Sequence, residues 1–292
     1  MTIDFHTKLN YLWLNGKFIK SDAAKIHLMT HSLHYSSSVF EGIRVYNGKA
    51  FKLTKHINRL LNSAKQLMIS LNFSIQEIKE ACLQLIKNNN LKNAYIRPLI
   101  WKGSESSKLA SDLLSTNTML AGWEITTPTQ ERPVNLCFSN WIKPHPKSMP
   151  PQCKSGGHYT MMIVSQIQAK DQGYSDAILL DWRGYIAECT TSNIFFVENN
   201  SIITPIADAF LNGITRQTVI EIAKKLDIIV QEKYINPDHI RNYQECFLTG
   251  TAMEIKAVKS IYYLKKNFTF HKTSISDKIK KSYNQMVLEF NE

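Results

Sequence analysis

A single lysine, Lys154, stands between a proline-rich approach and a glycine pair in the stretch PPQCKSGGHYTMM, residues 150–162. Burying a lone ammonium is costly and lysine is mostly a surface residue, so a tight surface turn is one interpretation. The other is a cleft that holds the amine for chemistry, where a nearby cation or burial makes it nucleophilic toward carbonyl groups. A glycine pair suits a backbone that approaches another group closely. Lys154 is therefore a candidate Schiff-base lysine.

Three further features could act together with this lysine. The loop 213–215, Gly-Ile-Thr, enters a helix whose free N–H groups and dipole could bind an anion, although an ordinary Thr-capped helix is commoner. Glu188 follows an apolar strand in YIAECTTSNIFF and could pair with a ring nitrogen, or could be a solvated turn residue. Arg59 lies at the edge of a helix's apolar stripe, where it could reach a phosphate or remain a surface arginine.

Hairpins and amphipathic helices are predicted in the first part of the chain. Asn15-Gly16 and Asn47-Gly48, each flanked by apolar residues, are typical of two-residue hairpin turns. A helix is predicted from Thr54, and a second one after the capping-box pattern of residues 74–77. Residues 93–103, NAYIRPLIWKG, are typical of a strand, in which Pro98 predicts an edge or a bulge.

The second part of the chain predicts more strands with interspersed helices. Strands are expected at residues 134–141, 193–197 and 201–205, with a hairpin turning at Arg183-Gly184. Helices are expected at residues 160–171 and after Gly213. The polar, proline-punctuated segment TTPTQERP predicts a linker. The fold class is therefore α+β or mixed α/β, with a small α+β domain at 1–125, an interdomain loop at 126–135 and a large domain at 136–292.

Composition excludes several classes of protein. The 292 residues carry a net charge of +11, but the lysines are dispersed, which favours solvated faces over a nucleic-acid surface. Five scattered cysteines without a Cys-x-x-Cys pair, and histidines without ligand spacing, argue against a disulfide framework and a metal site. No secretory signal and no apolar run of membrane-spanning length is evident, so a cytoplasmic protein is expected, without nucleic-acid or membrane partners.

Six motifs in order resemble the fold-type IV pyridoxal phosphate aminotransferases, and most closely the branched-chain amino acid aminotransferase family. The resemblance covers about residues 10–260, and VFEGIR with YIRP favours the branched-chain members over D-amino acid aminotransferases and aminodeoxychorismate lyases. The family's fold implies a small α+β domain and a larger β-rich pseudo-barrel with helices, with the cofactor between them. The motifs are SLHYSSSVFEGIRVY, AYIRPLIWKGSE, CKSGGHY, GYIAECTTSNIFF, LNGITRQTVIEIAKKL and CFLTGTAMEI.

The resemblance implies pyridoxal 5'-phosphate as the cofactor and a role for each candidate residue. Lys154 matches the lysine that binds the cofactor aldehyde and then moves the substrate Cα proton. Glu188 matches the carboxylate that pairs with the pyridine nitrogen, and Tyr159 matches the tyrosine that hydrogen-bonds the phenolic oxygen. The positions that match the phosphate site are Arg59, Ile214, Thr215 and Thr251.

The resemblance also implies the substrates and a homodimer or higher homo-oligomer. The reaction would transfer amino groups from Leu, Ile or Val to 2-oxoglutarate in two half-reactions, through pyridoxamine phosphate. Arg97 matches the residue that meets the distal carboxylate of glutamate. Tyr35 and Leu109 match positions that a neighbouring subunit donates. The other positions that match substrate contacts are Phe40, Gly42 and Tyr95 for the aliphatic side chain, and Thr251 and Ala252 for the α-carboxylate.

Departures from the family's pattern keep alternatives open. ECTTSN replaces a small-residue turn and leans toward the D-amino acid branch, with Cys189 and Thr190 as bulkier neighbours of the cofactor. The alternatives are a D-amino acid aminotransferase, an aminodeoxychorismate lyase-like enzyme, or a cofactor-binding or basic nucleic-acid-binding protein with little turnover. The other departures are His158, Lys256, and Ile125 with Pro128 in the interdomain segment.

Overall fold

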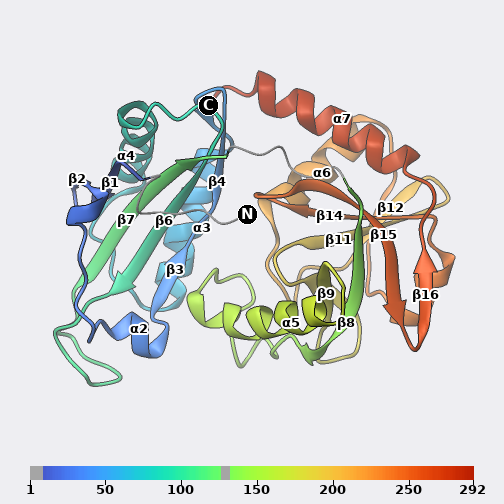
Figure 1. Ribbon diagram of the computed structural model, residues 1–292, viewed down its shortest axis with the longest axis horizontal. Helices are drawn as coiled ribbons and strands as arrows, with labels where there is room; N and C mark the ends of the chain where they lie inside the picture. The colour runs from blue at the N-terminus through green and yellow to red at the C-terminus, as the bar shows by residue number, and fades with distance from the viewer. Residues whose placement is uncertain (1–8, 126–131) are drawn as a thin grey trace. The chain divides into compact units, whose positions relative to one another are not determined.

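The computed structural model describes residues 9–125 and 132–292, and these form two compact units (Figure 1). The first unit contains the chain up to residue 127 together with residues 153–158 and 288–292. The second unit contains residues 128–152 and 159–287. Of the predicted linker at 126–135, residues 126–131 lie outside the described residues, and a strand already begins at Val134.

The first unit is built on an antiparallel sheet in which the strands run in the order β2-β1-β7-β6-β4-β5, with β3 beside β6. A buried cluster of aliphatic side chains lies between this sheet and two long helices, α3 and α4. The strands are β1 (Tyr11–Leu14), β2 (Lys17–Lys20), β3 (Ser38–Phe40), β4 (Ile43–Tyr46), β5 (Lys49–Ala50), β6 (Ala94–Lys102) and β7 (Thr116–Glu124). The helices are α2 (His31–Tyr35), α3 (Leu53–Gln66) and α4 (Ile75–Asn88).

Both predicted Asn-Gly hairpins are confirmed. Asn15 and Gly16 have φ of 48° and 92°, and Asn47 and Gly48 have φ of 48° and 79°. Two consecutive residues at positive φ form the type of turn whose twist matches that of paired strands, and Asn and Gly tolerate this conformation best. The turns close the β1–β2 and β4–β5 pairs.

The two predicted helices of this unit are also confirmed. Helix α3 buries Ile57, Leu60 and Ala64 on one face, as their spacing requires. Helix α4 begins after Ser74, whose hydroxyl accepts the N–H of Glu77 while the Glu77 carboxylate accepts the N–H of Ser74. This reciprocal capping box satisfies two N–H groups that a helix start otherwise leaves unpaired.

Of the two options predicted at Pro98, an edge or a bulge, the edge is wrong, because β6 lies inside the sheet. Pro98 pairs with Leu120 of β7 on one side. On the other side β3 ends at Phe40 and β4 begins at Ile43, and between them the N–H of Glu41 donates to the Pro98 carbonyl at 2.9 Å. The missing proline N–H therefore falls where the neighbouring strand is interrupted, and that interruption puts Glu41 and Gly42 beside β6.

The second unit is a mixed sheet in the order β10-β9-β8-β15-β14-β11-β12-β13, with β16 beside β15. The N–H of Ile186 in the edge strand β10 donates to the carbonyl of Ile235, just beyond β13 at the other edge. The sheet therefore curls around one apolar core, as in the predicted pseudo-barrel. The strands are β8 (Val134–Ile142), β9 (Asp176–Leu180), β10 (Ile186–Cys189), β11 (Asn193–Glu198), β12 (Ser201–Thr204), β13 (Val230–Glu232), β14 (Glu245–Gly250), β15 (Glu254–Tyr263) and β16 (Lys266–Thr269).

Three helices accompany this sheet. Helix α5 (Tyr159–Asp171) packs on β8 and β9, helix α6 (Ile214–Lys225) on β13 and β14, and α7 (Ser274–Glu289) ends near the chain terminus. Both helices predicted for this part are confirmed, as is the β9–β10 hairpin, whose turn has Gly184 at φ 87°. The mixture of antiparallel hairpins, parallel pairs and helices confirms the predicted fold class.

The lysine turn groups with the first unit, although the predicted boundaries put it in the domain 136–292. The reason lies in main-chain contacts. The N–H of Phe40 donates to the Lys154 carbonyl at 3.1 Å, and Val39 and Ser155 form a β-bridge. The C-terminal residues 288–292 also join the first unit, where Phe290 packs edge-on against Phe51.

Two features concern the chain as a whole. Within residues 9–125 and 132–292, no helix has the length and apolar character needed to cross a membrane. All five cysteines are buried thiols, so their contribution is to packing rather than to cross-linking.

Candidate active site

Lys154 is fixed by its main chain beside the end of β3. Its N–H donates to the Ser63 hydroxyl of α3 at 3.0 Å, and its carbonyl accepts from Phe40. Its ammonium lies 4.8 Å from the centre of the Phe40 ring. The lysine is therefore half-buried on a turn tied to a strand and a helix, which agrees with a held amine and not with a free surface turn.

The predicted pocket residues of the first unit lie around the same phenylalanine. The guanidinium of Arg97 is 4.9 Å from the Phe40 ring centre and 5.6 Å from that of Tyr95. A Cβ added to Gly42 would lie 1.7 Å from the Tyr95 hydroxyl, so only glycine leaves room for the tyrosine there. The structure thus brings Lys154, Phe40, Gly42, Tyr95 and Arg97 together.

Arg59 is held by a carboxylate that the sequence analysis did not single out. Glu41 is fully buried and accepts hydrogen bonds from Arg59 Nε at 2.5 Å and Arg59 Nη2 at 2.9 Å. It also accepts from His56 Nδ1 at 2.7 Å and from the Gly42 N–H at 3.2 Å. The fork of Arg59 is therefore pre-oriented on α3 by a fixed carboxylate.

The charges in this cluster are set by burial and by one another. Burial alone would raise the pKa of Glu41, but Arg59 and His56, through charge and hydrogen bonds, outweigh it and hold that pKa well below its usual range. Burial lowers the pKa of His56, Arg59 and Lys154 act in the same direction, and Glu41 opposes them. The proton on His56 Nδ1 faces the Glu41 carboxylate.

Glu188 lies in β10 of the second unit and both of its carboxylate oxygens are engaged. Lys143 Nζ donates to Oε1 at 2.9 Å, and Asn193 Nδ2 donates to Oε2 at 3.2 Å. Glu188 and Lys143 are both buried, and this pairing offsets much of the cost of burying two charges. The interpretation of Glu188 as a solvated turn residue is therefore wrong.

Asn193 connects Glu188 to the start of helix α6. Its Oδ1 accepts the N–H of Gly213 at 3.2 Å, and a Cβ on Gly213 would lie 2.2 Å from that oxygen. Gly213 is the N-cap of α6, and among the described residues no side chain caps the helix. The N–H groups of Ile214 and Thr215 therefore lie at the helix start, which is the end that favours anion binding. The predicted Thr cap does not form.

The turn with Thr251 and Ala252 lies at the same end of this sheet. It follows β14, whose Gly250 approaches the carbonyl of Thr191 so closely that a Cβ would lie 3.3 Å away. Ser192 Oγ and Thr249 Oγ1 are shielded from solvent and have no hydrogen-bond partner among the described residues. Buried polar groups are normally hydrogen-bonded, so a bound polar ligand or water is one explanation for such groups. Tyr159 is the first residue of α5, in the same unit.

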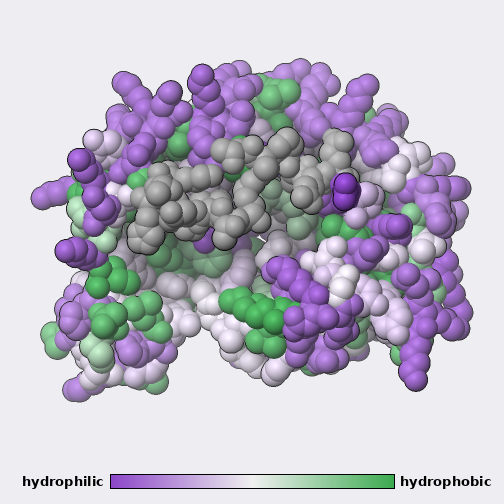
Figure 2. Space-filling view, viewed as in Figure 1, coloured by the Kyte–Doolittle hydropathy of each residue, from purple (hydrophilic) through white to green (hydrophobic). Residues whose placement is uncertain are grey.

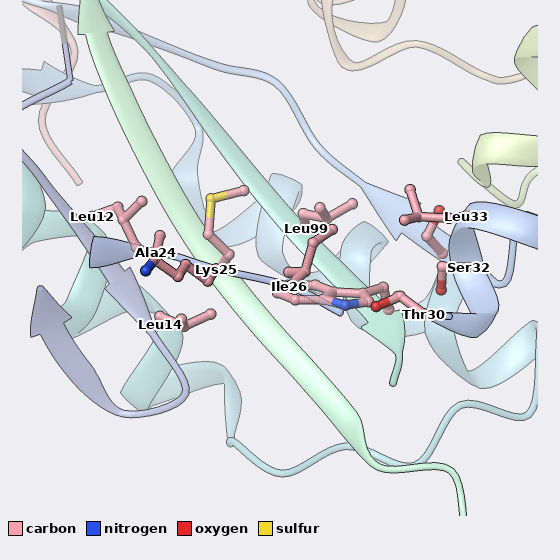
Figure 3. Close-up of a pocket in the computed structure, with 12 residues that line it drawn as sticks. Leu12, Leu14, Ala24, Lys25, Ile26, Thr30, Ser32, Leu33 and Leu99 are labelled. Carbon is pink, nitrogen blue, oxygen red and sulfur yellow. The ribbon is translucent and has the colours of Figure 1, made fainter. Parts of the chain in front are cut away.

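Tyr35 and Leu109 lie together on the surface of the first unit. The His31 ring centre lies 4.7 Å from that of Tyr35 with the rings tilted by 49°, and His31 Nε2 is 3.2 Å from the Leu109 carbonyl oxygen. Beside them a cavity of about 390 Å³ opens between β1, β6, β7 and α2, with Leu12, Leu14, Leu99 and Leu33 among its walls (Figure 3). Apolar side chains gather around α2 in the surface view (Figure 2).

The departures from the family pattern have defined places. The Cys189 side chain lies in the apolar core, where burial raises its pKa, and Thr190 donates to the buried Asp176 at 2.5 Å. Both side chains thus contribute to the interior of the second unit. His158 is buried, burial lowers the pKa of Lys256 with help from Lys280, and Ile125 follows β7. Pro128 lies outside the described residues.

Four residues of the site escaped sequence reasoning: Glu41, His56, Lys143 and Asn193. Glu41 lies within the motif VFEGIR, and His56 is three residues before Arg59, so one helical turn linking them was a signal that could have been used. Asn193 lies within the motif GYIAECTTSNIFF, five residues after Glu188, whereas Lys143 lies in no motif and meets Glu188 only through the arrangement of the strands.

The chain is similar to known proteins over nearly its whole length. Residues 38–261 match the family model described as amino-transferase class IV. The chain is 50% identical over 279 residues to a protein of Rickettsia felis named probable branched-chain-amino-acid aminotransferase, which covers 96% of each chain.

Solved structures of branched-chain aminotransferases have a similar fold. The branched-chain aminotransferase of the archaeon Thermoproteus uzoniensis, crystallised with norvaline, superposes with a TM-score of 0.90 at 30% identity, over 96% of this chain and 95% of that one. The branched-chain amino acid aminotransferase of Thermobaculum terrenum, solved in its PLP form, has a TM-score of 0.87 at 27% identity, over 96% of this chain and 94% of that one.

Proposed function

We propose that this chain, which belongs to the amino-transferase class IV family, transfers the amino group of branched-chain L-amino acids to 2-oxoglutarate. Members of this family are aminotransferases that use pyridoxal 5'-phosphate, so the chain is an aminotransferase. The relatives named above support the substrate class, because one is named for branched-chain amino acids and one was crystallised with norvaline, an unbranched aliphatic amino acid.

The residues present fit the cofactor. The uncapped start of α6 and the guanidinium of Arg59 would hold the phosphate, the Glu188 carboxylate would meet the ring nitrogen, and Lys154 would bind the aldehyde. The orphaned hydroxyls of Ser192 and Thr249 agree with a polar ligand at that end of the sheet. When bound, the cofactor would supply a carbonyl that accepts the amino group and an electron-accepting ring.

The chain's own residues then have separate tasks. Lys154 Nζ would act as the base that takes up the proton from the substrate Cα. Tyr159 would donate a hydrogen bond to the cofactor's phenolic oxygen, and the turn N–H groups at Thr251 and Ala252 would bind the substrate α-carboxylate. Arg59 enters the reaction already oriented by Glu41, so no reorganisation of its fork is needed on binding.

The side-chain pocket must accept both an aliphatic group and a carboxylate. Phe40 and Tyr95 provide apolar walls beside Lys154, and Arg97 lies over both rings. Arg97 Nε is shielded from solvent without a hydrogen-bond partner among the described residues, so it is a donor ready for a distal carboxylate. This donor beside an apolar wall and a held lysine is the observation that carries the proposal.

The test is amino transfer by the purified chain loaded with pyridoxal 5'-phosphate. L-leucine, L-isoleucine and L-valine are offered with 2-oxoglutarate, and L-glutamate is measured, with Lys154→Ala as the inactive control. Glutamate formation from the three donors is expected. A faster reaction with D-alanine would replace this proposal by the D-amino acid alternative, and release of pyruvate from aminodeoxychorismate would favour the lyase.

We further propose that two copies complete each site. Tyr35 and Leu109, which the resemblance implies are donated to a neighbouring subunit, lie together beside the apolar cavity of Figure 3. The exposed Leu33 at its rim gives the test. Leu33→Asp is expected to give monomers in analytical ultracentrifugation, whereas Leu264→Asp, on an exposed turn of the second unit, is expected to leave a dimer. A monomeric wild-type chain would contradict the proposal.

A further inference from the structure

Lys143 is a buried lysine that the mechanism above does not use. It follows directly after β8, and its N–H donates to the Leu180 carbonyl of β9 at 2.7 Å. Its side chain is 3% exposed. A fully desolvated ammonium is rare in proteins because losing its hydration costs free energy. The buried ammonium of Lys143 therefore needs a partner of opposite charge.

The partner is Glu188, and the sheet geometry explains how the two meet. Strand β9 lies between β8 and β10, so the two side chains span a distance of about 10 Å across a central strand. The strand pairing is irregular on both sides of β9, between Phe138 and Ile142 and between Ile186 and Glu188. Such bulges re-aim side chains, and here Lys143 Nζ comes within 2.9 Å of Glu188 Oε1.

Together with Asn193, this contact fixes the plane of the carboxylate. Lys143 takes one lone pair of Oε1, and Asn193 takes one of Oε2 at 3.2 Å. Each oxygen keeps a further lone pair for another donor. Because Asn193 also holds the Gly213 N–H, the carboxylate is oriented relative to the start of α6.

We propose that Lys143 is a positioning residue for the amino-transfer reaction, holding Glu188 in the orientation and charge balance needed to receive the cofactor's ring nitrogen. The proposal rests on the proposed function. Without Lys143, the Glu188 carboxylate would be buried with one neutral amide donor, that of Asn193, among the residues that the structure describes. It would then turn toward other donors or draw in water. The ring nitrogen would then meet a displaced partner, and both cofactor affinity and the electronic state of the ring would change.

The experiment compares cofactor binding by the wild-type chain, Lys143→Met and Lys143→Arg. Cofactor-free protein is titrated with pyridoxal 5'-phosphate, and the absorbance maximum of the bound cofactor is recorded. Lys143→Met is expected to weaken binding by roughly 10- to 100-fold and to displace the maximum, on the scale found when supporting partners of a ligand are removed. Lys143→Arg, which keeps the charge, is expected to recover most of the affinity.

Lys259→Met on β15, an exposed lysine of the same unit, is the matched control and is expected to bind as the wild type does. Folded Lys143→Met with wild-type affinity and absorbance would overturn the proposal, even if its urea midpoint fell, because a purely structural role would change only the midpoint. If Lys143→Met does not fold, Lys143→Gln, which keeps a donor without the charge, gives the same comparison. A wild-type chain that binds the cofactor but transfers no amino group would refute the proposed function and leave this test standing.

Discussion

Replacing Glu41 by glutamine tests whether the buried carboxylate holds Arg59. The change keeps the shape but removes the negative charge, and it turns an amide NH₂ toward donors on Arg59 and His56. Breaking a buried ion pair by removing one partner costs about 3–5 kcal/mol, because the other charge is left uncompensated. We therefore expect Glu41→Gln to lower the free energy of unfolding by that amount at pH 7, measured by urea unfolding of the cofactor-free protein.

The pH dependence sharpens this prediction. The pKa of Glu41 is lowered in the folded state, so its contribution is complete above the unfolded-chain value of about 4.3 and is lost as pH falls below it. At pH 3.5 the difference between wild type and Glu41→Gln should shrink by about 1 kcal/mol. Glu80→Gln, an exposed change on α4, should shift stability by no more than about 0.5 kcal/mol. A Glu41→Gln effect as small as this control's would refute the reasoning.

Three other substitutions probe the first unit. Arg97→Ala should slow the glutamate half-reaction roughly 10- to 100-fold more than the leucine one, because only glutamate has a distal carboxylate; equal losses would contradict its role. Gly42→Ala should raise KM for leucine by displacing Tyr95, whose hydroxyl would lie 1.7 Å from the new Cβ, and an unchanged KM would refute that packing. Because the pKa of His56 is lowered on folding, the wild-type chain should lose stability as pH falls below about 6.5. His56→Gln should therefore lose less stability than the wild type between pH 7.5 and 5.5. An unchanged slope of the urea midpoint against pH would contradict this.

Much of the fold could be predicted because the signals were local. The turns at Asn15-Gly16 and Asn47-Gly48 follow from the φ angles these residues tolerate, and the capping box at Ser74 is a contact within one helical turn. Pro98 was misplaced because its tolerance in β6 depends on an interruption between two other strands, which no local pattern contains.

The residues proposed to carry the chemistry can be named from the sequence, whereas those that support them cannot all be. Residue type, motif and resemblance single out Lys154 and Glu188, and the structure shows the contacts that hold each of them. Lys143 and Asn193 act through Glu188, and their roles come from strand order and two irregular pairings in the curled sheet. Cys189 follows Glu188 along β10, and the alternation of side chains along a strand directs it into the apolar core.

The claim that Lys154 binds the cofactor and gives it up to a branched-chain substrate has a direct test. Borohydride reduction makes the attachment of a carbonyl cofactor to an amine permanent, and peptide mass spectrometry then identifies the modified residue. We predict that the cofactor is found on Lys154, that prior addition of L-leucine leaves Lys154 unmodified, and that Lys154→Ala carries no modification. Modification of another lysine, or a Lys154 label that L-leucine does not reduce, would contradict the account.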